Sequence, residues 1–410
     1  MQIIILIILL CLGSLVIPKK NLIQYLIVAV AMISSLFFFF WPDNAYDLYR
    51  YYLMLKHYDT LSFLQAIGLK ENTLGSTLTE LSVRGYVINY KVYSLFAWLI
   101  SKVGLYQLLG VISCAIVYGL MCKQIINLYT NEKMRKATVI ITMIFCLLCY
   151  NVINLSLIRQ ALAYAVFAYV LYWDMVKQKN TIWCFIVYIL LCFVHSTGIM
   201  LLGFRLLIIV YKKISAVPII IGFFLVYSAI PIVENLLVKY KLSFLREFLV
   251  KMVHYLVDRA VLDEQHVSLK ATMLYIFLFL VLLYFMRYSR RKKEYKDYSV
   301  FIIFILAFCI PMVQQADIFN RFQLFLPIVF IPIIMELLEE FLGNKIISIK
   351  IKQHNFQPYF GIGLMLLGCV VIVIYFIGTC NDSYLGAQEF FSLDNFMRNG
   401  NMYGPAYWKQ

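Results

Sequence analysis

Charged residues are scarce in this chain, and no long polar stretch interrupts it before about residue 378. Only 14% of the 410 residues are charged, whereas 63% are hydrophobic and 17% are aromatic, and the mean hydropathy is +0.83. A soluble domain cannot bury so much apolar surface. The composition therefore predicts an all-α, polytopic integral membrane protein.

Motifs that identify several enzyme classes are also absent. The sequence has no glycine-rich phosphate loop, no HExxH helix and no framework of paired CxxC motifs. The ten cysteines fall mostly inside apolar stretches and are expected to be small packing residues. Ionisable residues are rare in the middle of these stretches, which disfavours proton pumps and ion channels. No internal or inverted repeat argues for a transporter.

The net charge of +15 comes from basic residues in short loops. Dispersed charge of this kind does not form a nucleic-acid-binding patch, so nucleic acid is excluded as a partner and membrane lipids are expected. Under the positive-inside rule these loops are expected to be cytoplasmic. They are Lys19-Lys20, Lys123 to Lys136, Lys177 to Lys179, Lys212-Lys213, Arg287 to Lys296 and Lys345 to Lys352.

A consistent threading has about twelve spans of roughly 20 residues each, with both termini outside. It requires 86–103, which carries Lys91 and Lys102 among apolar residues, to be an amphipathic helix in the outer interface. Residues 1–380 then form one transmembrane domain with outer segments 42–104 and 237–269, followed by an outer tail, 381–410. The predicted spans are 1–17, 21–41, 105–127, 137–154, 158–176, 181–195, 197–211, 217–236, 270–288, 298–315, 322–341 and 359–379.

Asp43, Asp47 and Arg50 follow the second predicted span at i, i+4 and i+7, which places them on one face of a helix. Two carboxylates and a guanidinium on one face can bind sugar hydroxyls, orient a base or hold a metal. Equally, the segment can be an interfacial cap with its charges in water.

Arg159 and Gln160 lie at the predicted outer end of another span, beside Asn154 and Ser156. A snorkelling arginine explains this position. An arginine in this costly place also suits bidentate phosphate recognition, which we favour.

His195 and Ser196 join two spans with almost no loop between them. The imidazole is expected at the outer boundary, where it can act as a general base or donate to a phosphate. A histidine that is only hydrogen-bonded within a tight turn is the competing interpretation.

Asn320 and Arg321 begin a further span at the outer face, four residues after Asp317. Asp317 and Arg321 can form a simple exposed ion pair. Together with Arg50 and Arg159, however, Arg321 is a third arginine at the same predicted boundary. Three guanidinium groups facing one leaflet indicate a diphosphate site.

The order of these motifs resembles that of the EpsG family of Wzy-type polysaccharide polymerases. The resemblance rests on Asp43…Asp47…Tyr49-Arg50-Tyr51, Arg159-Gln160-Ala-Leu-Ala, Val194-His195-Ser196, Asn320-Arg321-Phe322 and the tyrosine-rich tail. It spans most of the chain, although each motif is short.

The resemblance implies a GT-C-like membrane glycosyltransferase of the bacterial inner membrane, acting on the periplasmic or exterior side. It would join undecaprenyl-diphosphate-linked repeat units into surface polysaccharide such as O-antigen or capsule, without metal or other cofactor. Arg50, Arg159, Gln160, Asn320 and Arg321 would bind substrate. His195, Asp43 and Asp47 are the catalytic candidates, and which of them is the base stays open. A flippase and a chain-length regulator are implied partners.

Two functions other than polymerase also fit the sequence. An O-antigen ligase-like transferase would use a large outer loop with basic and histidine residues, for which 237–269 is suitable. A flippase or transporter for lipid-linked sugars would need polar groups along the full depth of the bundle, whereas the polar residues here gather at one end.

Overall fold

In the computed structural model, every regular secondary-structure element of the described residues is a helix. The described residues are 13, 16–18, 21–35, 47–67, 90–131, 134–149, 157–179, 181–212, 218–223, 269–310, 322, 324–343 and 363. No strand occurs among them, which confirms the all-α class for this part of the chain. The principal helices are α2 (Leu22–Ser35), α3 (Asp47–Thr60), α4 (Phe63–Ala66), α6 (Lys91–Val103), α7 (Leu108–Asn131), α8 (Lys136–Cys149), α9 (Ile158–Met175), α10 (Thr181–Cys192), α11 (Thr197–Tyr211), α14 (Leu269–Arg291), α15 (Lys296–Cys309) and α17 (Leu326–Gly343).

Helices α9 and α15 form the centre of a helical bundle. Almost every side chain of α9 is buried, including Phe167 and Leu171, and so are most side chains of α15. A helix that is largely apolar all round is expected to be buried on all sides. Helix α9 packs against α7, α10, α11, α15 and α17, and its alanines allow the neighbouring backbones to approach closely.

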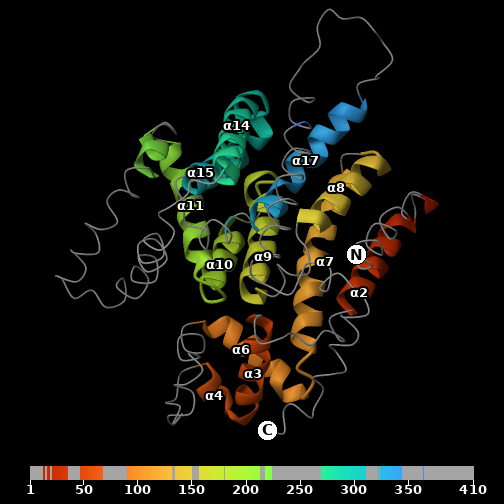
Figure 1. Ribbon diagram of the computed structural model, residues 1–410, viewed down its shortest axis with the longest axis vertical. Coiled ribbons are helices and arrows are strands. Elements are labelled where there is room, and N and C mark those ends of the chain that lie inside the picture. The colour runs from red at the N-terminus through yellow and green to blue at the C-terminus, as the bar shows by residue number, and fades with distance from the viewer. Residues whose placement is uncertain are drawn as a thin grey trace, which may run out of the picture.

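Helices α3, α4 and α6 gather at one end of the bundle, beyond the ends of α9 and α10 (Figure 1). Helix α6 packs on α3, where the Tyr58 hydroxyl donates to Ser94 Oγ at 2.8 Å. The Trp98 indole donates to the carbonyl of Leu61 at 3.0 Å. The helix predicted within 86–103 is therefore confirmed as α6. Its buried face packs on α3. Its location in a membrane interface stays a prediction.

At the other end of the bundle, basic residues from the loops contact the glutamates near the C-terminus of α17. Lys292, between α14 and α15, pairs with both Glu336 and Glu340. Arg135, from the loop before α8, donates its backbone N–H to Glu339 at 2.8 Å. Burial alone would lower the Lys292 pKa, but the two hydrogen-bonded glutamates raise it.

A further ion pair joins Lys212 to Asp297 at 2.9 Å. Residues from three of the basic loops predicted to share one side, Lys123 to Lys136, Lys212-Lys213 and Arg287 to Lys296, thus contact α15 or α17. We call this the basic-loop end. Which side of a membrane it faces stays a prediction.

One described segment, Leu108–Thr130 of α7, is long and apolar enough to cross a membrane. Shorter apolar helices of 10–17 residues are Leu22–Ser35, Lys136–Cys146, Thr181–Cys192 and Thr197–Tyr211. Several described helices match the predicted ranges to within a few residues, for example α9 and 158–176. The count of about twelve spans and the GT-C-like architecture remain predictions.

Helices α10 and α11 are joined by a turn too tight for a side chain at Gly198. The Gly198 N–H donates to the His195 carbonyl at 2.9 Å. A Cβ atom at this position would lie 2.6 Å from the Leu191 carbonyl oxygen. Because that contact is with backbone, it can be relieved only by moving the turn.

We therefore expect Gly198→Ala to destabilise the protein by about 1–3 kcal/mol, because the α10–α11 turn must open. Gly203→Ala in the same helix is the matched control, since no atom lies within 4 Å of a Cβ built there. Thermal unfolding of the purified protein in detergent measures both. Equal melting temperatures for the two variants would contradict the tight packing of this turn.

Candidate functional site

Arg159 lies in the first turn of α9 and is buried, with a relative exposure of 4%. Its Nε donates to the Tyr51 hydroxyl of α3 at 3.1 Å. Three tyrosine rings surround the guanidinium carbon, with centroids at 5.2 Å for Tyr51, 4.9 Å for Tyr90 and 5.5 Å for Tyr93. We call the end of the bundle that contains this cluster the tyrosine end.

Cation–π contacts explain how a guanidinium can be held in this buried position. A desolvated contact with one aromatic face contributes about 2 kcal/mol, and Arg159 has three such neighbours. Tyr51 and Tyr93 also contact each other edge to face at 5.8 Å, so the cluster supports its own geometry. Lysine would not reproduce it, because only the planar guanidinium stacks on aromatic faces and donates in a fork.

His195 is buried in the α10–α11 turn, with a relative exposure of 6%. Its Nδ1 lies 2.9 Å from Thr197 Oγ1, and the backbone N–H of Thr197 donates to the same nitrogen at 3.3 Å. The imidazole stacks on the ring of Tyr90 with centroids 6.0 Å apart and an angle of 11° between planes.

Tyr90 joins the two predicted functional residues, since its ring contacts both the Arg159 guanidinium and the His195 imidazole. The start of α6 is held against the α10–α11 turn because the N–H groups of Val92 and Tyr93 donate to the Phe193 carbonyl, at 3.2 and 3.4 Å. Tyr90 was not among the site residues predicted from the sequence. The local sequence feature that could have indicated Tyr90 is its spacing of three residues from Tyr93, at the start of an amphipathic segment.

The other predicted site residues are less fully described. Gln160 is buried next to Arg159, and its amide donates to the Tyr164 hydroxyl at 2.9 Å. Asp47 and Arg50 lie in α3, the helix that carries Tyr51, but their side chains are outside the described part of the structure. Asp43, Asn320 and Arg321 also lie outside the described residues.

Burial shifts the pKa values of three side chains of α3, all toward the neutral form. Burial raises the pKa of Tyr52, and it raises that of Tyr58 despite the hydrogen bond to Ser94 and the nearby charge of Arg159. Both hydroxyls therefore stay protonated and neutral. Burial also lowers the pKa of His57, which favours its neutral form.

Arg205 belongs to a separate buried ion pair. Its Nε and Nη2 donate to Asp174 Oδ2 and Oδ1 at 2.6 and 3.2 Å, and the Tyr188 hydroxyl donates to Oδ2 at 3.1 Å. Asp174 follows Arg159 along α9 by about 22 Å at the helical rise of roughly 1.5 Å per residue. The pair is thus distant from the tyrosine cluster and holds α9, α10 and α11 together.

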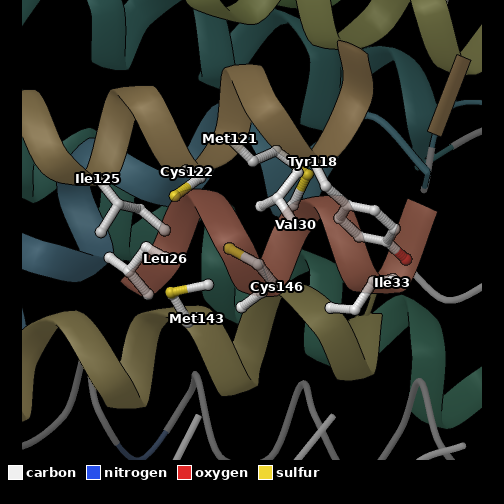
Figure 2. Close-up of a pocket in the computed structure, with 10 residues that line it drawn as sticks. Leu26, Val30, Ile33, Tyr118, Met121, Cys122, Ile125, Met143 and Cys146 are labelled. Atoms are coloured by element: carbon white, nitrogen blue, oxygen red, sulfur yellow. The ribbon is translucent and has the colours of Figure 1, made fainter. Parts of the chain in front are cut away.

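An apolar groove lies between α2, α7 and α8 (Figure 2). Side chains from all three helices point into it, and its lining is almost free of polar atoms. A groove of this chemistry suits a hydrocarbon chain. Its lining residues are Leu26, Ala29, Val30, Ile33, Tyr118, Met121, Cys122, Ile125, Met143 and Cys146.

No group of three or more metal-ligating side chains comes together within the described ranges. Cys114, Cys122, Cys146, Cys184 and Cys309 are buried free thiols, which agrees with the expectation that cysteines act as apolar packing residues. Among the described residues, the tyrosine end offers the positive charge of Arg159 and the hydrogen-bonding groups of Arg159 and His195.

Comparison with known proteins identifies a family for this chain. No curated protein and no solved structure shows significant similarity to the chain. The sequence model of the EpsG family, in contrast, matches residues 25–377, which is most of the chain. Membership of this family supports a general role of the polysaccharide polymerase type, with glycosyltransferase-like chemistry in a membrane protein. The chain belongs to the EpsG family.

Proposed function

We propose that this protein joins undecaprenyl-diphosphate-linked oligosaccharide repeat units into surface polysaccharide at the outer face of the bacterial inner membrane. One observation carries the proposal within the family assignment: the buried Arg159 guanidinium and the His195 imidazole contact the same ring, Tyr90. A cation and a hydrogen-bonding imidazole in one buried cluster suit an anionic, sugar-bearing substrate.

Transfer of a glycan from a lipid diphosphate creates negative charge on the leaving group. A preorganised guanidinium stabilises such charge most effectively where water is excluded. Arg159 is the described residue in that role, and Arg50 and Arg321 are further predicted donors. The acceptor hydroxyl must also lose a proton, for which His195, Asp43 and Asp47 are the predicted groups.

The lipid part of the substrate requires an apolar surface. The groove between α2, α7 and α8 (Figure 2) has a suitable lining for a polyprenyl chain, since apart from the Tyr118 phenol it presents almost entirely hydrocarbon and sulfur groups. Partners such as a flippase and a chain-length regulator would supply the repeat units and set the length of the product.

Glycan analysis of cells that lack the protein separates this function from the alternatives. A polymerase defect leaves single repeat units on the surface or on the carrier, whereas a ligase defect leaves full-length polymer on the carrier. A flippase defect keeps lipid-linked units in the cytoplasmic leaflet. Full polymer in any location would contradict the proposed polymerase.

Tyr90 provides a residue-level test. Tyr90→Leu removes the ring between Arg159 and His195 and is expected to slow polymer synthesis by about 5- to 30-fold, corresponding to a loss of about 1–2 kcal/mol of cation–π interaction. Tyr90→Phe keeps the ring and should stay within about twofold of the wild type. The measurement is the rate of chain growth after induction in cells with matched protein levels.

Tyr169→Leu is the matched control for Tyr90→Leu. Tyr169 also lies under a cation, Lys123 at 5.4 Å, but farther along α9, away from the tyrosine cluster. We expect normal polymer from this variant. Similar defects in Tyr90→Leu and Tyr169→Leu would mean that Tyr90 has only a structural role.

A further inference from the structure

The hydrogen bonds of His195 determine which ring nitrogen carries its proton. Nδ1 receives the backbone N–H of Thr197 at 3.3 Å, and a backbone N–H can only donate. Nδ1 must therefore be unprotonated, and the Thr197 hydroxyl at 2.9 Å can donate to it as well. In a neutral imidazole the proton is then on Nε2.

This tautomer limits the chemistry available to His195. A protonated Nε2 can donate a hydrogen bond but has no lone pair with which to accept a proton. The basic nitrogen, Nδ1, already faces the Thr197 N–H. A general base needs its lone pair within hydrogen-bond reach of the proton that it removes, so the geometry disfavours His195 as the base.

We propose that His195 acts as a hydrogen-bond donor through Nε2–H to the oxygen of the departing diphosphate, and that Thr197 is the positioning residue that fixes this tautomer. The inference rests on the proposed function, because it assigns a role within the glycan transfer. Of the three candidate bases predicted from the sequence, Asp43 and Asp47 then remain.

The stacking of His195 on Tyr90 supports this role. Both the imidazole and the Arg159 guanidinium contact the Tyr90 ring, so two N–H donors of different kinds are held by one aromatic side chain. Donors fixed in advance toward developing negative charge need no reorganisation during the reaction. The α10–α11 turn, which Gly198 allows to be tight, adds to this rigidity.

In the proposed transfer, the bond between the anomeric carbon and the diphosphate oxygen breaks, and its electron pair leaves on the diphosphate. The acceptor oxygen forms the new bond to the anomeric carbon. The proton of the acceptor hydroxyl passes to a carboxylate, for which Asp43 and Asp47 are the predicted groups. His195 keeps its own proton throughout.

Two amide substitutions test the assignment. The terminal amide of glutamine reaches the position of Nε2, whereas that of asparagine reaches only the position of Nδ1. We expect His195→Gln to keep polymer synthesis within about tenfold of the wild type, and His195→Asn and His195→Ala to lose about 100-fold or more. A base would not be replaced by either amide. If glutamine is as inactive as alanine at equal protein level, the donor role is wrong.

A spectroscopic measurement tests the tautomer directly. Purified protein labelled with ¹⁵N-histidine, compared with His195→Gln to assign the signal, should show a protonated Nε2 and a bare Nδ1 at neutral pH. Thr197→Ser keeps the hydroxyl donor and should preserve this signature, whereas Thr197→Val should weaken it. A protonated Nδ1 in the wild type would overturn the inference.

Arg159→Ala, measured in parallel, distinguishes a failure of the donor role of His195 from a failure of the proposed function. If Arg159→Ala and His195→Ala both retain full polymer, the proposed function of this site fails. If both lose polymer but His195→Gln does not restore it, only the donor role fails.

Discussion

Replacing Arg159 by alanine is expected to reduce polymer synthesis by about 100- to 1,000-fold, so that surface glycan falls to single repeat units. The guanidinium is buried among Tyr51, Tyr90 and Tyr93 and is the described cation at the tyrosine end best placed to stabilise a leaving diphosphate. Arg159→Lys should recover little of the activity, because an ammonium group lacks the fork and the planar stacking. The measurement is the length distribution of surface glycan by gel electrophoresis.

Lys91→Ala is the control for loss of positive charge near this site. Lys91 is an exposed lysine directly after Tyr90, and its removal should leave the glycan ladder unchanged. Protein levels in the membrane fraction must match the wild type in both variants. Long chains made by Arg159→Ala at a normal protein level would contradict the diphosphate role.

Replacing Asp174 by alanine is expected to destabilise the protein by about 3–5 kcal/mol, because it leaves the charge of Arg205 buried without its partner. The Asp174 side chain is 1% exposed and that of Arg205 is 11% exposed. The loss should appear as a low yield of folded protein and a lower melting temperature in detergent. Tyr188 also loses its hydrogen-bond acceptor in this variant.

Asp297→Ala is the matched control, since Asp297 pairs with Lys212 at 2.9 Å but the two side chains are 32% and 62% exposed. Water screens this pair, so the expected change is about 0–1 kcal/mol. The double variant Asp174→Leu with Arg205→Met removes both buried charges and should recover much of the lost stability. Equal stability of Asp174→Ala and Asp297→Ala would show that burial of the Asp174–Arg205 pair has no energetic consequence.

Apolar stretches in the sequence predicted several of the described helices closely, because the position of a helix depends largely on its local sequence. The ranges 158–176 and 197–211 agree closely with α9 and α11, and the turn at His195 follows from the near absence of a loop. Arg205 has Asp174 as its partner, as a deeply placed arginine requires. Local sequence thus contains most of the information on helix position.

Contacts between distant segments could not be predicted in the same way. Tyr90 precedes Arg159 and His195 by many residues, and nothing in its own neighbourhood indicates that α6 docks on the α10–α11 turn. The amphipathic pattern of 86–103 was assigned to a membrane interface, but the same pattern fits the packing of α6 on α3. An apolar helix face indicates burial without identifying what covers it.

The most direct test of the central claim is chain elongation by purified protein. Lipid-linked repeat units extracted from cells that lack the protein would be incubated with wild-type protein and with Arg159→Ala in liposomes. We expect longer lipid-linked glycans and release of free undecaprenyl diphosphate with the wild type, and single repeat units with Arg159→Ala. Unchanged repeat units with correctly folded wild-type protein, or equal elongation by the variant, would contradict it.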